Sequence, residues 1–259
     1  MNSRQSSALL LTNDDGVHAP GIAALYAALQ ALNLHALVAA PLAQRSGAGQ
    51  AITLDRPLRA MDIAGREHWW GIDGTPADCV YLGRTALAGE KKVGLVVSGI
   101  NDGPNLAEDT LYSGTVAAAR EAAVWNIPAI AFSSTSRACA NLNAMAAVAA
   151  RLTARCLDAC TQWPEGMFLN VNLPDNPGVD QTPWVLTGLG RRSYGQDITR
   201  GLDPRGRPYW WIGGAVTGCQ GAPGSDCHAV AHGRVSITPL HVLGGARPAD
   251  PFFTTLLTR

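Results

Sequence analysis

The chain has no clustered charge of one sign and little charge altogether. Its 259 residues include 20 Lys or Arg and 20 Asp or Glu, so the formal net charge is zero. No run of Lys or Arg forms a basic patch, which argues against nucleic acid or an anionic membrane as the main partner. The sequence therefore predicts neither a nucleic-acid partner nor a membrane partner.

Long hydrophobic runs are also absent. The first apolar run spans only 8–11 before Thr12 and two acids, which is far too short for the core of a signal peptide. No stretch approaches the roughly 18 apolar residues of a membrane-spanning helix. We therefore expect a soluble, cytoplasmic protein.

The spacings by which cysteine and histidine bind metals or act as nucleophiles are missing as well. The six cysteines contain no CxxC pair, and they predict buried or idle thiols in a reducing cytoplasm. The six histidines show no helix-spaced metal pair. There is no GxxxxGK[ST] loop, no Ser-His-Asp or Cys-His arrangement readable from spacing, and no internal repeat. The cysteines are Cys79, Cys139, Cys156, Cys160, Cys219 and Cys227.

The first strong pattern is a buried-strand run that ends in two adjacent carboxylates. Residues 9–11 are leucines, and Asp14, Asp15 and Gly16 follow closely. Open α/β sheets bind ligands at the carboxyl ends of their strands, and two adjacent like charges there are usually offset by a cation. The alternative is that Asn-Asp-Asp-Gly is only a tight turn. The stretch alone leaves both interpretations open.

The rest of the chain alternates between strand and helix patterns. Apolar residues three and four apart predict a helix after Pro20, and 35–40 predicts a second strand that completes a β-α-β unit. The fold class is therefore α/β, with a Rossmann-like, doubly wound, mostly parallel sheet covered by helices on both faces. Further strands are expected at 58–63, 68–73, 93–98, 128–133, 168–172 and 234–240, and further helices after Thr75, after Ser113, at 142–157 and from Asp250.

Two later loops follow buried strands and can lie beside the acidic turn. Ser46 is in a polar, glycine-bearing loop after the second strand, and Asn101 follows the strand at 93–98. A serine hydroxyl there could complete the oxygen shell of a cation, although loop serines beside glycines are most often turn residues. Asp14, Asp15, Ser46 and Asn101 thus come from three separated segments, and an all-oxygen set suits one Mg²⁺ or Mn²⁺ rather than zinc.

A candidate anion site follows in the stretch 113–115. Ser113, Gly114 and Thr115 open a predicted helix, and exposed amides at a helix N-terminus bind anions. The alternative is ordinary N-capping by Ser113. A cation site beside an anion site points to a phosphate ester as the substrate.

The composition changes near residue 190. Arginines, glycines and prolines become frequent, and Tyr209, Trp210 and Trp211 form an aromatic run. We expect one domain over 1–259, with a metal- and phosphate-binding core at 1–189, a projecting hairpin at 190–232, and a C-terminal strand and helix at 233–259. Exposed aromatics beside arginines are typical of interfaces, so the hairpin is predicted to mediate oligomerisation rather than nucleic-acid binding.

Five segments together resemble one family. They are LLLTNDDGVHAPGI at 9–22, RSGAGQAIT at 45–53, GTPADCV at 74–80, VSGINDGPNLAEDTLYSGTVAAAREA at 97–122 and GRVSITPL at 233–240. They resemble the SurE family of stationary-phase survival proteins. The resemblance implies a metal-dependent phosphatase acting on nucleoside 5′- and 3′-monophosphates, with exopolyphosphatase activity in some members. It also implies a Rossmann-like fold that forms dimers or tetramers.

The resemblance also implies roles for individual residues. The family's metal ligands correspond to Asp14, Asp15, Ser46 and Asn101, and its phosphate-binding stretch corresponds to 113–115. We add Asn105 to the expected substrate-binding residues, and we assign Asp14, Asp15 and Asn101 to catalysis. The chain departs from the family pattern at three positions, namely Leu42 for an aspartate, Ala107 for a glycine and Arg234 for a tyrosine.

We expect a nucleotidase that uses metal-activated water. Adjacent carboxylates such as Asp14 and Asp15 are better placed to share one cation than to attack phosphorus, because a carboxylate held on a cation is a poor nucleophile. The alternatives are a non-catalytic nucleotide-binding regulator and a phosphatase whose main substrate is polyphosphate. The expected assembly is a homodimer or homotetramer.

Overall fold

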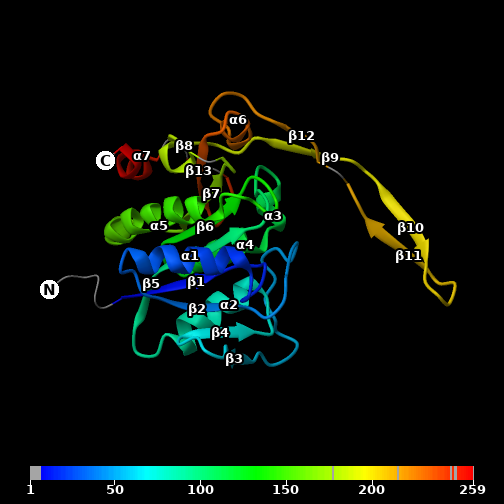
Figure 1. Cartoon of the computed structure of the whole chain (residues 1–259), viewed down its shortest axis with the longest axis horizontal. Coiled ribbons are helices and arrows are strands. Elements are labelled where there is room, and N and C mark those ends of the chain that lie inside the picture. The colour runs from blue at the N-terminus through cyan, green and yellow to red at the C-terminus, as the bar shows by residue number, and fades with distance from the viewer. Residues whose placement is uncertain (1–6, 177, 215, 246, 248–249, 259) are drawn as a thin grey trace.

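A nine-stranded sheet forms the centre of the computed structural model, which describes residues 7–258 apart from 177, 215, 246 and 248–249 (Figure 1). Its strands are β1 (Ser7–Thr12), β2 (Ala36–Pro41), β3 (Ala60–Asp62), β4 (Trp69–Ile72), β5 (Lys92–Asn101), β6 (Ala129–Ser134), β7 (Met167–Leu173), β8 (Trp184–Leu186) and β13 (Val235–His241). They lie in the order β3-β4-β2-β1-β5-β6-β7-β13-β8, with β3–β4 and β13–β7 antiparallel and the other neighbours parallel. The predicted mostly parallel α/β sheet is confirmed.

Helices cover both faces of this sheet. The α-helices are α1 (Pro20–Ala31), α2 (Pro76–Leu82), α3 (Asp109–Tyr112), α4 (Gly114–Val124), α5 (Leu142–Ala159), α6 (Asp226–Ala231) and α7 (Pro251–Thr258). Short π or 3-10 turns occur at η2 (Gly83–Leu87), η3 (Cys160–Gln162) and η4 (Val179–Gln181). The expected helices after Pro20, Thr75 and Ser113, at 142–157 and from Asp250 are all present, whereas α6 and the short strand β8 were not predicted.

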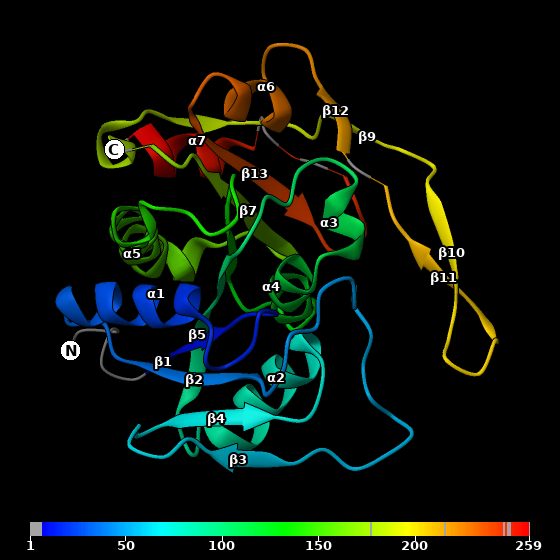
Figure 2. The same ribbon diagram turned by 45° about the vertical axis from the view of Figure 1, so that its right-hand side comes forward.

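Alternation along β1 divides the core between the two faces. Leu9 and Leu11 point into the cluster formed with α1 and α5, and Leu10 points into the cluster formed with α2 and α4. Figure 2 shows these two pairs of helices on opposite sides of the strands. A strand that is buried on both faces needs an unbroken apolar run, which explains the three consecutive leucines.

The order of the strands reverses at β1. From β1 the chain continues through α1 to β2 on one side, and β5 lies on the other side. The helix α1 approaches the end of β5 so closely that a Cβ atom on Gly21 would lie 1.9 Å from the carbonyl oxygen of Ile100. Open α/β sheets have a crevice at the carboxyl ends of their strands where the order reverses. The loops that follow β1 and β5 therefore face one crevice.

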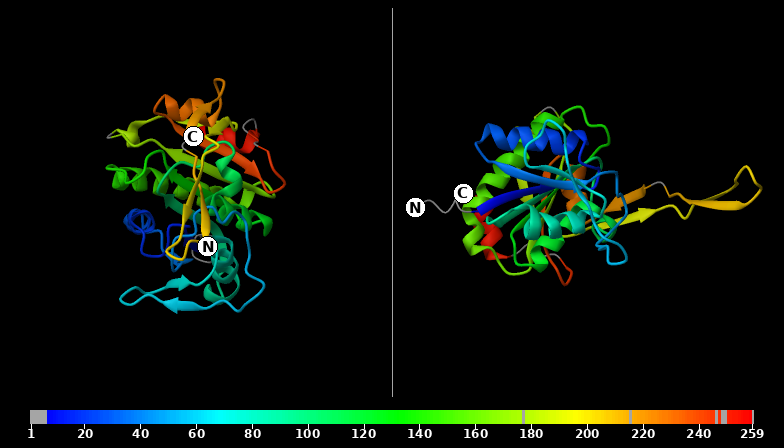
Figure 3. Two further views of the ribbon diagram at one scale, coloured as in Figure 1. Left: turned by 90° about the vertical axis from the view of Figure 1, so that its right-hand side faces the viewer. Right: turned by 90° about the horizontal axis from the view of Figure 1, so that it is seen from below.

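A long β-arm projects from the body, as expected for the predicted hairpin. Its root pairs β9 (Arg191–Tyr194) with β12 (Val216–Gln220), and its outer part pairs β10 (Ile198–Leu202) with β11 (Pro208–Ile212). Figure 3 shows the arm extending well beyond the sheet and its helices. The helix α6 lies within the predicted hairpin span 190–232, but it packs against β13 rather than projecting. No helix in the described part of the chain is long and apolar enough to cross a membrane.

Candidate active site at the carboxyl edge of the sheet

The loop after β1 combines a tight turn with two available acids. Asn13 closes the turn, because its Nδ2 donates to the Gly16 carbonyl oxygen at 2.8 Å and its Oδ1 accepts from the Gly16 amide at 3.2 Å. Gly16 has φ of 105°, a conformation that favours glycine. The turn is thus made by Asn13 and Gly16, and this leaves Asp14 and Asp15 to face the crevice.

Asp14 is buried and held from one side. The Thr115 hydroxyl donates to its Oδ1 at 2.5 Å, and the residue is 3% exposed. Burial raises the pKa of Asp14, while hydrogen bonds from the Thr115 side chain and from the backbone at Thr115 and Gly114 oppose that rise. The N-terminus of α4 therefore points at this carboxylate.

Asp15 is more accessible than Asp14, and its pKa is raised to about 6. The largest cause is burial, the Asp102 amide opposes it by donating to Oδ2 at 2.9 Å, and the Asp14 and Asp102 carboxylates raise the pKa further. The positive charge of Arg137 lowers it. The pKa values of both carboxylates are thus raised, and a cation bound between them would stabilise their ionised forms, as expected for a metal site.

Asn101 and Ser46 present neutral oxygens to the same crevice. The Asn101 Nδ2 donates to the Gly103 carbonyl oxygen at 2.7 Å, and Oδ1 lies 3.5 Å from the Thr115 hydroxyl, on the side of Asp14. The Ser46 hydroxyl accepts from Gln44 Nε2 at 2.9 Å. The Arg45 amide donates to the Asp14 carbonyl oxygen at 2.7 Å and ties the serine loop to the acidic turn.

These residues line one pocket of about 550 Å³, which is in the size range of small-molecule sites. The expected ligands Asp14, Asp15, Ser46 and Asn101 all contribute to its wall. Two carboxylates, an amide and a hydroxyl form an all-oxygen donor set that fits a hard divalent cation. Among the described residues, no three His, Cys, Asp or Glu side chains are grouped so that they could hold one metal ion. A cation at Asp14 and Asp15 would therefore also need the oxygens of Asn101 and Ser46.

The expected phosphate-binding stretch begins α4 beside the acids. Ser113 caps the helix, because its hydroxyl accepts from the Val116 amide at 3.1 Å. Gly114 packs directly on Asp14, since a Cβ atom at Gly114 would lie 2.8 Å from the Asp14 Cβ. Ser113 thus caps the helix, as the alternative interpretation expected. The first turn of α4, which was expected to face a phosphate, lies against the Asp14 carboxylate. A phosphate-binding role for 113–115 stays a prediction.

Asn105 lines the pocket but is also part of a buried polar network. Its Nδ2 donates to the Ser133 hydroxyl at 2.7 Å, and its amide donates to Asn172 Oδ1 at 2.9 Å. Its carbonyl oxygen accepts from the side-chain amides of Asn170 and Asn172. The network fixes the loop after β5, whatever Asn105 does for a substrate.

Several side chains in the pocket wall were not predicted, and three of them come from the most distant segments. Arg137 comes from the loop after β6, and Arg192 and Tyr194 come from the root of the arm. Arg192 forms a largely buried ion pair with Asp109 of α3, and its backbone amide donates to Glu108 Oε2 at 2.6 Å. Local sequence patterns could not place them, because each reaches the site through tertiary contacts between distant segments.

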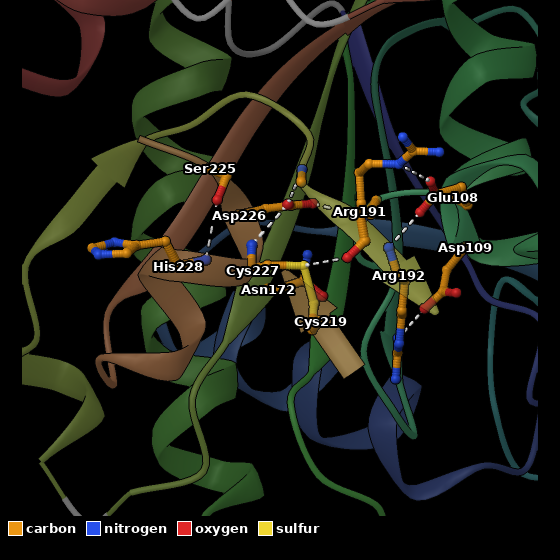
Figure 4. The surroundings of a disulfide bond; sticks show 12 residues. Glu108, Asp109, Asn172, Arg191, Arg192, Cys219, Ser225, Asp226, Cys227 and His228 are labelled. Carbon is orange, nitrogen blue, oxygen red and sulfur yellow. Dashed lines mark hydrogen bonds and ion pairs between the residues drawn. A yellow bond between two sulfur atoms is a disulfide. The ribbon is translucent and has the colours of Figure 1, made fainter. Parts of the chain in front are cut away.

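One sequence interpretation is wrong near the root of the arm (Figure 4). Cys219 of β12 and Cys227 of α6 form a disulfide, although all six cysteines were predicted to be thiols. The error arises because the helix α6, which carries Cys227, was not predicted. His228 in α6 and His232 directly after it stack with ring centroids 4.1 Å apart.

The fold and the pocket together define a doubly wound α/β protein with an acidic, oxygen-lined site where the strand order reverses. The chain belongs to the SurE family, because the family model described as survival protein SurE matches residues 9–196.

Similarity to known proteins extends over most of the chain. The chain is 48% identical to the 5′-nucleotidase SurE of Geobacter sulfurreducens, over 90% of this chain and 87% of that protein. It is 45% identical to the 5′-nucleotidase SurE of Myxococcus xanthus, over 92% and 89% of the two chains. The crystal structure of the SurE protein from Aquifex aeolicus is similar with a TM-score of 0.76 and 39% identity, covering 91% of this chain and 93% of that one.

Proposed function

We propose that this protein is a divalent-metal-dependent nucleotidase that hydrolyses nucleoside 5′-monophosphates, and also 3′-monophosphates, to nucleoside and phosphate. The observation that carries the proposal is the pair Asp14 and Asp15 facing one pocket with the oxygens of Ser46 and Asn101. The similarity to proteins named 5′-nucleotidase SurE supports the choice of substrate.

The four oxygen donors would hold one Mg²⁺ or Mn²⁺. When bound, such a cation lowers the pKa of a water molecule and polarises a phosphoryl oxygen. The protein's own contribution is orientation. The Thr115 hydroxyl fixes the Asp14 carboxylate, the Asp102 amide fixes the Asp15 carboxylate, and the bond to Gly103 turns the Asn101 amide so that its oxygen faces the acids.

We also propose that Asp14 is not the nucleophile. Its Oδ1 accepts a short hydrogen bond from Thr115, and in the proposed ligand set the carboxylate also binds the cation, so it is a poor nucleophile. Single-turnover hydrolysis in ¹⁸O-water should place the label in the released phosphate. Label recovered in a peptide that contains Asp14 would make this carboxylate the nucleophile.

A phosphate-release panel tests the activity. We expect release from 5′-AMP, 5′-GMP and their 3′ isomers with added Mn²⁺, and none in EDTA. Nucleotide binding without release would instead support a non-catalytic regulator, and faster release from polyphosphate would identify a different main substrate.

Substitution of Ser46 tests the proposed ligand set. Calorimetry with Mn²⁺ should show weaker binding to Ser46→Ala, because a neutral ligand is lost while both carboxylates remain. Unchanged affinity would leave Ser46 as a turn residue only.

We further propose that the protein assembles as a homodimer or homotetramer through the arm. The arm exposes Trp210, Trp211 and Ile212, which are 58%, 68% and 92% exposed. An apolar strip of this kind on a projecting element is typical of a protein–protein contact.

A further inference from the structure

The pocket contains more negative than positive charge. Four carboxylates line it, from Asp14, Asp15, Asp102 and Asp109. Arg137 and Arg192 are the cationic side chains of its wall within the described ranges. Because Arg192 is paired with Asp109 and both side chains are only 12% exposed, its charge is already balanced inside the protein. Arg137 is exposed, and among the residues that the structure describes none forms a hydrogen bond or ion pair with its guanidinium.

The loop that carries Arg137 is fixed on both sides of it. On one side the Ala138 amide donates to Asp102 Oδ1 at 2.6 Å. On the other side the Ser136 hydroxyl donates to Asp175 Oδ2 at 2.7 Å. Asp102 also donates its own amide to Asp15, so one residue links the arginine loop to the acidic turn. The backbone at Arg137 is therefore held in place, and its charge already acts on Asp15, so the arginine lies within electrostatic reach of a ligand at the acidic turn.

The stem of Arg137 lies over the loop that follows β5. A Cβ atom on Gly103 would lie 3.7 Å from Arg137 Cγ and 3.9 Å from Nε, so the side chain runs across this glycine, and both residues line the pocket. The planar guanidinium presents several N–H donors in a fork that matches two oxygens of a phosphoryl group.

We propose that Arg137 is a specificity-determining residue, and that its guanidinium binds the phosphoryl oxygens of a substrate whose scissile group lies at Asp14, Asp15 and Asn101. The inference rests on the proposed nucleotidase function. The charges of the pocket wall fit this role. A divalent cation would offset Asp14 and Asp15, and Arg192 is paired with Asp109, so Asp102 and Arg137 remain, and of these two only Arg137 can attract a phosphate monoester. Arg137 is the available cation of the pocket wall in the described structure.

The test compares Arg137→Ala and Arg137→Lys with the wild type. Arg234→Ala is the matched control, because Arg234 is an exposed arginine of the body outside the pocket wall. Three constants are measured for each protein: KM for 5′-AMP, the inhibition constant of inorganic phosphate, and the inhibition constant of adenosine, which has no phosphate. Melting temperatures verify that each variant is folded.

We expect Arg137→Ala to raise KM and the phosphate inhibition constant by about ten- to a hundredfold, the range for losing a hydrogen bond to a charged group. The adenosine constant should not change. Arg137→Lys should fall between wild type and Arg137→Ala, because it keeps the charge but loses the fork. An unchanged phosphate constant in Arg137→Ala would overturn the proposal, and so would an equal weakening of phosphate and adenosine.

Calorimetry separates this proposal from the proposed activity. Inorganic phosphate and 5′-AMP are titrated into each protein with and without Mn²⁺, and Mn²⁺ is titrated alone. If the wild type hydrolyses no nucleotide, the activity proposal fails, whereas weaker phosphate binding by Arg137→Ala still supports the role of Arg137. The Mn²⁺ affinity of Arg137→Ala should not fall, because the arginine repels a cation. A fall in Mn²⁺ affinity would show that the substitution distorts the acidic turn and would overturn the assignment.

Discussion

Asp15 holds its proton more tightly in the folded protein than in the unfolded chain. Burial raises its pKa from the ordinary value of 3.8 to about 6, so the folded state binds more protons between these pH values. The stability that Asp15 contributes is therefore fully present below about pH 4 and is lost as the pH rises through about 6. A bound cation would remove this effect, because it favours the ionised carboxylate.

This shift predicts a pH-dependent difference between the wild type and Asp15→Asn in EDTA. The variant cannot ionise at this position, so its melting temperature should rise relative to the wild type between pH 5 and pH 7.5. Added Mn²⁺ should raise the melting temperature of the wild type at pH 7.5 more than that of the variant. The same difference in melting temperature at both pH values would show that the pKa of Asp15 is not raised.

Thr115 and Ser113 stand two residues apart at the start of α4 but have different tasks. The Thr115 hydroxyl orients Asp14, and the Ser113 hydroxyl caps the helix. We expect Thr115→Val to weaken Mn²⁺ binding by about tenfold or more, as is common for residues that orient metal ligands. Ser113→Ala should lower the free energy of unfolding by about 1 kcal/mol. Calorimetry measures the Mn²⁺ affinity, and urea unfolding measures the stability. Equal Mn²⁺ affinities for wild type and Thr115→Val would show that Thr115 does not orient a metal ligand.

At the scale of elements, α6 joins the arm to the body. Its first residue, Asp226, is buried and accepts hydrogen bonds from the Ala107 amide at 2.8 Å and the Gly190 amide at 2.6 Å. These bonds connect the loop before α3, the start of the arm and α6 at one carboxylate. The disulfide between Cys219 and Cys227 adds a covalent link at the same place (Figure 4).

The disulfide predicts a thiol count and a stability change. Denatured, unreduced protein should react at four thiols, those of Cys79, Cys139, Cys156 and Cys160, and reduced protein at six. The link spans eight residues, so the loop-entropy model gives about 2.5 kcal/mol of stabilisation. Urea unfolding with and without reductant measures this, and Cys219→Ser is the control that should not respond to reductant. Six reactive thiols without reductant would show that the bond does not form.

The sequence predicted the elements of the sheet better than it predicted contacts between distant segments. Asp14 and Asn101 could be placed together because each lies at the carboxyl end of a buried strand, and the carboxyl ends of parallel strands share one edge. Arg137 could not be placed, because its position depends on Asp102 and Asp175 from other loops. The disulfide was missed for a different reason, because its cysteines are only eight residues apart but Cys227 sits on α6, whose sequence has little apolar periodicity.

At the scale of the whole molecule, the arm is both a wall of the pocket and a projecting surface. Tyr194 and Val216 belong to its root and line the pocket, while the outer pair β10–β11 makes no part of that wall. Shortening only the outer pair should therefore leave the site and the disulfide in place. This separation allows assembly to be tested without disturbing the proposed chemistry.

We expect removal of 198–212, with Asp197 joined to Gly213, to shift the mass measured by light scattering towards the monomer. The join is geometrically possible because the Gly213 amide already donates to the Asp197 carbonyl oxygen at 3.0 Å. The physical reason is the loss of the exposed apolar side chains of β11, whose burial between copies would stabilise the assembly.

A milder pair of variants controls for the deletion. Ile212→Ser on the arm and Leu243→Ser on the body each replace a nearly fully exposed apolar side chain, 92% and 90% exposed respectively. Only Ile212→Ser should weaken the assembly, seen as a higher protein concentration at the midpoint of dissociation. If the shortened protein keeps the wild-type mass, the copies associate through another surface, and the exposed tryptophans of the arm must have a different partner.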